Sequence, residues 1–125
     1  MIENNTRDKT IAIINTQAPF STAVGKEALD AALIFGSYEQ ATSIFFLGDG
    51  VFQVIGDQNA SSIAVKDYLK TFSALEFYDI ENIYLCKESL NERNLPANFH
   101  IDNIQVLAKN EFSQRLHSHH VIYRF

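Results

Sequence analysis

The chain has 125 residues, of which 46% are hydrophobic and 20% charged, and its net charge is -5. This length fits one domain with a single core and leaves too few residues for two ordinary domains. An excess of fifteen acidic over ten basic residues argues against a protein that grips a nucleic-acid backbone directly. Apolar runs are only strand-sized, and residues 1–9 form a polar tail without an apolar h-region, so we expect a soluble, cytoplasmic protein that does not contact membranes.

Strands and helices are predicted to alternate along the chain. A β-branched run at 10–15 predicts a buried strand, and helical spacing of apolar residues predicts a helix over about 22–36, with Thr22 as its N-cap. A second strand at 43–47 ends in a Gly-Asp-Gly turn, and a helix follows to about residue 77. The strand at 83–86 leads into a short helix that ends near Asn94. A strand at 104–107, a helix over about 110–116 and a strand at 121–125 complete the chain.

This alternation predicts an α/β fold, specifically a flavodoxin-like three-layer α/β/α sandwich with a mostly parallel five-stranded sheet. Functional groups in such sheets gather at the carboxyl ends of the strands. The loops at 16–22, 48–53 and 86–88 are therefore the first places to look for a site.

Cys86 is the one cysteine of the chain, which excludes an internal disulfide and any cysteine-rich metal site. It closes a predicted strand directly before a predicted helix, where backbone N–H groups and Lys87 would favour a thiolate. A thiolate there could carry a persulfide. The alternative is a small apolar residue that fills the sheet, because free cysteine is among the most buried residue types.

Other candidate sites are weaker. Asp49 could cap a helix, bind a cation or contact a partner, but bonding to its own backbone in a turn is the favoured interpretation. The histidines at 117, 119 and 120 have poor spacing for one metal ion, so we expect a solvated loop and no metal site. Ser21 and Thr22 lack a nucleophile elbow. The chain carries neither a P-loop nor a dinucleotide motif, so no cofactor is expected.

Several segments together resemble the DsrE/DsrF-like family of sulfur-relay proteins. The most specific are the stretches Asp49-Gly50-Val51-Phe52-Gln53 and Tyr78-Asp79-Ile80-Glu81. Further matches are Ala18-Pro19 with Thr22, Gly25-Lys26-Glu27, Asp67-Tyr68, and Cys86 with Ser89-Leu90 and Glu92-Arg93. The resemblance covers nearly the whole chain.

The resemblance implies a DsrF-like subunit of a sulfurtransferase complex, assembled with TusB-like and TusD-like subunits as a dimer of heterotrimers. Such a complex passes persulfide sulfur from TusA-like to TusE-like carriers for 2-thiolation of the wobble uridine in tRNA. The essential thiol is attributed to the TusD-like subunit, so this chain would be mainly structural and Cys86 a doubtful sulfur acceptor. A role in sulfur oxidation, as in DsrEFH systems, is the alternative. With ten Phe and five Tyr available, we expect Phe52, Tyr78 and Phe125 to contact partner subunits.

Overall fold

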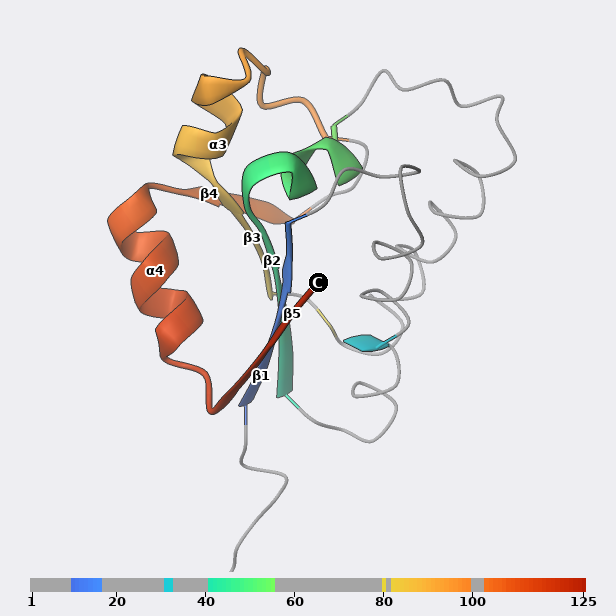
Figure 1. Ribbon diagram of the computed structural model, residues 1–125, viewed down its shortest axis with the longest axis vertical. Helices are drawn as coiled ribbons and strands as arrows, with labels where there is room; N and C mark the ends of the chain where they lie inside the picture. The colour runs from blue at the N-terminus through green and yellow to red at the C-terminus, as the bar shows by residue number, and fades with distance from the viewer. Residues whose placement is uncertain (1–9, 17–30, 33–40, 56–79, 81, 100–102) are drawn as a thin grey trace, which may run out of the picture.

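The structure is a computed structural model that describes residues 10–16, 31–32, 41–55, 80, 82–99 and 103–125 (Figure 1). Its elements are listed here in chain order: β1 (Thr10–Asn15), β2 (Ala41–Phe46), the 3₁₀ helix η2 (Gly48–Gln53), β3 (Asn82–Cys86), α3 (Lys87–Glu92), β4 (Ile104–Leu107), α4 (Lys109–His117) and β5 (Val121–Arg124). All five predicted strands are present. The helices predicted over 22–36 and 61–77 lie outside the described residues, except for residues 31–32, which are helical.

The five strands form one sheet in the order β4-β3-β2-β1-β5, and all four pairings are parallel. The predicted flavodoxin-like α/β fold is thereby confirmed. Strand β2 begins two residues before its apolar run, because Ala41 and Thr42 pair with the start of β1. Strand β1 has a neighbour on both sides, and its residues after Thr10 are buried, as expected for a central parallel strand.

The two faces of the sheet carry separate apolar clusters. Alternating residues of β1 and β2, such as Ile13 and Ile44, pack with Ala32, Val51 and Leu90 on one face. Helix α4 covers the other face, where its Phe112 meets Phe45 edge-on at a ring-centroid distance of 5.3 Å. The helical stretches α3 and η2 gather at the carboxyl end of the sheet, while α4 runs back toward the amino end (Figure 1).

The helices in the described part of the chain are all too short or too polar to cross a membrane.

Candidate functional site

Cys86 lies where the sequence places it, as the last residue of β3 and the extended residue that precedes α3. Its side chain is only 2% exposed and belongs to the apolar cluster beneath α4, together with Tyr84, Leu107 and Phe112. Within the described part of the chain, the thiol makes a long hydrogen bond of 3.9 Å to Oε1 of Glu88. In the isolated chain, Cys86 therefore contributes to sheet packing and does not present its sulfur at the surface.

The loop after β2 is the 3₁₀ helix η2, and its glycines have distinct roles. Gly48 adopts a positive φ of 58°, which glycine tolerates better than other residues. Gly50 packs against the end of β1 so closely that an added Cβ would overlap the carbonyl oxygen of Asn15 and lie 2.6 Å from its carbonyl carbon. Close backbone approach therefore requires glycine at position 50.

The side chain of Asp49 pairs with Arg93, a partner that the turn interpretation did not predict. Its Oδ1 accepts a hydrogen bond from Nε of Arg93 at 3.0 Å and also lies 3.0 Å from Nη2 in the same ion pair. Arg93 also donates from Nη1 to the carbonyl oxygen of Ser89 at 3.2 Å, and the N–H of Gly48 donates to Oγ of Ser89 at 2.9 Å. These bonds join the η2 loop to the helix that follows Cys86, so two of the three predicted loops form one surface.

Helix α3 ends in a left-handed residue. Asn94 has a φ of 53°, and the N–H of Leu95 donates to the carbonyl oxygen of Leu90 at 3.0 Å. This six-to-one hydrogen bond is typical of a Schellman C-cap, in which glycine or asparagine is favoured. The cap fixes the end of α3 and holds Arg93, one residue earlier, beside Asp49.

A buried amide that the sequence did not single out lies at the same edge of the sheet. Asn15 is 1% exposed, and its Nδ2 donates to the carbonyl oxygen of Phe45 at 3.2 Å. Its Oδ1 accepts no hydrogen bond from the described residues. The signal available in the sequence was a polar residue at the carboxyl end of an otherwise apolar strand.

The structure describes two of the three predicted interface residues, Phe52 and Phe125. Phe52 in η2 is half-buried. Phe125 is also half-buried, packs against the core and is fixed to β1, because its N–H donates to Ile14 and its carbonyl oxygen accepts from Thr16. Tyr78, Ser21 and Thr22 lie outside the described residues. Among the described residues, the exposed large apolar side chains are Ile122 and Tyr123 of the edge strand β5, at 40% and 42%.

The three histidines near the end of α4 point to three different partners. Nδ1 of His117 lies 2.9 Å from the carbonyl oxygen of Ser113, while Nδ1 of His120 lies 3.1 Å from the backbone nitrogen of Thr10. His119 is half-buried and turns inward onto the sheet, so the prediction of a solvated loop was wrong for this residue. The described part of the chain holds no group of three or more metal-ligating side chains.

Comparison with known proteins gives consistent results. The model of the DsrE/DsrF-like family matches residues 9–123. The chain is 40% identical over 118 residues to "Protein TusC" of Klebsiella pneumoniae strain 342, covering 94% of this chain and 99% of the relative. A TusC protein from another K. pneumoniae strain is 38% identical over the same length. The crystal structure of the ychN protein from E. coli is 19% identical and superposes with a TM-score of 0.73 over 94% of this chain and 99% of that one, which is a likeness of fold.

Proposed function

The chain belongs to the DsrE/DsrF-like family, and on that premise we propose that it is a structural subunit of a sulfur-relay complex that serves tRNA 2-thiolation. The observation that carries this proposal is its 40% identity to a TusC protein over almost the full length of both chains. The complex would pass persulfide sulfur from TusA-like to TusE-like carriers, with the sulfur held on another subunit.

The surroundings of Cys86 support a structural role for this subunit. To accept sulfur from a carrier, the Cys86 thiolate would have to attack the outer sulfur of the carrier's persulfide. A new S–S bond of about 2.05 Å would form at Cys86 while the donor S–S bond breaks and the donor thiolate leaves. Cys86 belongs to the apolar cluster under α4, and only 2% of the residue is exposed. A donor cysteine on a carrier protein could reach this sulfur only after the residues that cover it had moved.

The partners in this proposal are TusB-like and TusD-like subunits in a dimer of heterotrimers. The exposed apolar side chains of β5 and the half-buried Phe52 offer aromatic and aliphatic contact area of the kind that subunit interfaces use. The Asp49–Arg93 pair links the η2 loop to the end of α3. Phe52 would therefore contact a partner from a loop that is tied to the neighbouring helix. Phe125 and Tyr78 complete the proposed contact residues.

Co-expression tests this assignment. A tagged copy of the chain, produced with TusB-like and TusD-like subunits from the same genome, should retain both partners through size-exclusion chromatography at the mass of a heterohexamer. A tagged copy of an unrelated flavodoxin-like protein is the control for non-specific capture. A chain that elutes alone, with both partners soluble and folded, would refute the proposal.

A second candidate role rests on the position of Cys86 at the carboxyl end of β3, directly before α3. This is the place in the sheet where the resemblance puts the active cysteine of the TusD-like subunit. In that role Cys86 would itself accept sulfur as a persulfide. Cys86→Ser separates the two roles, since only a sulfur carrier would lose tRNA thiolation while the complex still assembles.

A further inference from the structure

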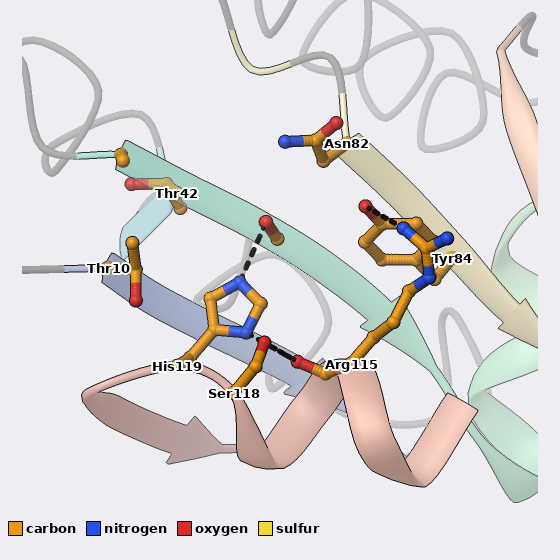
Figure 2. Close-up of a pocket in the computed structure, with 9 residues that line it drawn as sticks. Thr10, Thr42, Asn82, Tyr84, Arg115, Ser118 and His119 are labelled. Atoms are coloured by element: carbon orange, nitrogen blue, oxygen red, sulfur yellow. Dashed lines mark hydrogen bonds between the residues drawn. The ribbon is translucent and has the colours of Figure 1, made fainter. Parts of the chain in front are cut away.

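A polar pocket (Figure 2) lies at the amino end of the sheet. Cys86 lies at the other end of the strands, as the last residue of β3. The volume of the pocket is about 270 Å³. The first residues of β1, β2 and β3 form one side of the pocket. The end of α4 and the turn that follows it form the facing side. The lining residues include Thr10, Ser43, Asn82, Tyr84, Arg115 and His119.

The register of the sheet explains why this space is open. Ala12, Ser43 and Asn82 form one row across three strands, and Thr10 with Ala41 forms the next row toward the amino end. These rows present small or short side chains toward α4. One row further along, large rings fill the same layer, where Phe45 packs on Tyr84 with a ring-centroid distance of 5.0 Å. The pocket therefore lies on the amino-terminal side of these rings.

His119 closes one side of the pocket and is held by two hydrogen bonds. Its Nδ1 lies 2.8 Å from the carbonyl oxygen of Arg115, so Nδ1 carries a hydrogen. In the neutral ring, Nε2 then accepts a hydrogen bond from the hydroxyl of Ser43, at 2.9 Å. The ring also packs edge-on against Phe45 at 5.4 Å. His119 is therefore a fixed wall of the pocket, as Figure 2 shows.

The opposite side carries the positive charge of the pocket. Nη1 of Arg115 donates to the hydroxyl oxygen of Tyr84 at 3.3 Å, and its guanidinium carbon lies 5.2 Å from the centre of the Tyr84 ring. Nη2 pairs with Glu111 at 3.2 Å. These two bonds, that to Tyr84 first, raise the pKa of Arg115 above its ordinary value, so the group stays charged. Among the described residues, these contacts occupy two of its five N–H groups, which leaves donors for a ligand.

Two further side chains beside Arg115 can donate hydrogen bonds into the pocket. The hydroxyl oxygen of Tyr84 accepts from Arg115, and its own O–H group is a further donor at the pocket. The side-chain amide of Asn82 lies two residues before Tyr84 on the same face of β3 and also lines the pocket. None of the described lining residues is a carboxylate, and Arg115 supplies a positive charge at the pocket wall.

We propose that this pocket binds a small oxyanion, held by the guanidinium of Arg115 and by the hydroxyl of Tyr84 and the amide of Asn82. Guanidinium groups match the paired oxygens of phosphate, sulfate and carboxylate groups. The volume is slightly below the range of about 300–1,000 Å³ that is typical of drug-sized ligand sites, which favours a small anion over a nucleotide. The chain has a net charge of -5, so an anion would be attracted here by this local arrangement and not by the overall charge.

Titration of the full chain with inorganic phosphate, sulfate or acetate, at constant ionic strength kept with chloride, tests the proposal by backbone amide NMR. We expect saturable shifts confined to the amides of the lining residues. Stronger binding of phosphate or sulfate would identify a tetrahedral anion, and stronger binding of acetate a carboxylate. Arg115→Gln should weaken binding at least about 10-fold, because it removes a charge-assisted contact.

Lys109→Gln is the matched control, because it removes one positive charge from the other end of the same helix, outside the pocket. It should change affinity less than about twofold. Tyr84→Phe removes a single hydroxyl and should weaken binding about fivefold even if Arg115→Gln fails to fold. Absence of saturable shifts with all three anions, or equal losses in Arg115→Gln and Lys109→Gln, would overturn the proposal.

Discussion

Gly50→Ala tests how closely the η2 loop packs against the end of β1. The added Cβ would overlap the carbonyl oxygen of Asn15, lie 2.6 Å from its carbonyl carbon and lie 3.1 Å from the backbone nitrogen of Thr16. All three atoms are backbone, and the carbonyl of Asn15 also accepts a 3.0 Å hydrogen bond from the N–H of Leu47. No side chain can rotate away, so η2 must move by more than 1 Å or β1 must distort.

Overpacking of this kind costs typically 1–3 kcal/mol, and a clash with backbone atoms alone places this variant at the upper end, at about 3 kcal/mol. With a urea m-value of about 2 kcal/mol/M, the unfolding midpoint should fall by about 1.5 M. Gly48→Ala is the matched control: a Cβ there meets nothing closer than 3.8 Å, so only its positive φ costs energy, about 1 kcal/mol. A Gly50→Ala variant within 0.5 kcal/mol of the parent, or less affected than Gly48→Ala, would refute this description of the loop.

Three further predictions concern the same edge of the sheet. A double-mutant cycle of Asp49→Asn and Arg93→Gln should give a coupling energy of about 0.5 kcal/mol, since Asp49 is 61% exposed; a value above 2 kcal/mol would contradict this. Asn94→Gly should leave the free energy of unfolding unchanged or raise it, whereas Asn94→Ala should lower it by about 1 kcal/mol; equal effects would argue against the left-handed cap. The thiol of Cys86 should react with a disulfide reagent at least about 100-fold more slowly in the native chain than in urea, and equal rates would show that it is accessible.

The strands of this fold were predictable because each is a short apolar run between polar or glycine-containing segments. Thr10–Asn15 has the β-branched composition of a central parallel strand, and it is one. The left-handed conformation of Asn94 could also be predicted from the sequence, because asparagine tolerates that region and the helical pattern stops there. The start of β2 was less clear, because Ala41 and Thr42 join the strand through pairing with β1 and not through apolar character of their own.

The side-chain partners were not predictable, because they depend on tertiary placement. Asp49 meets Arg93, which lies 44 residues later in the chain, and the local turn gives no sign of this contact. His119 meets Ser43 across 76 residues, although its neighbours in sequence indicated a solvated loop. The pocket itself arises from the register of three strands, which places small side chains in one row. Local propensity carries no information about such rows.

The central claim is that this subunit supports sulfur relay without carrying sulfur itself, and the 2-thiouridine content of tRNA tests it most directly. Cells in which the gene is deleted should lose wobble 2-thiolation, and a copy carrying Cys86→Ser should restore it to at least about 80% of the parental level, since the sulfur lies in the apolar cluster under α4. Immunoblotting and co-purification of partner subunits confirm that the variant assembles. Loss of thiolation in an assembled Cys86→Ser complex would contradict the claim and make Cys86 a sulfur carrier.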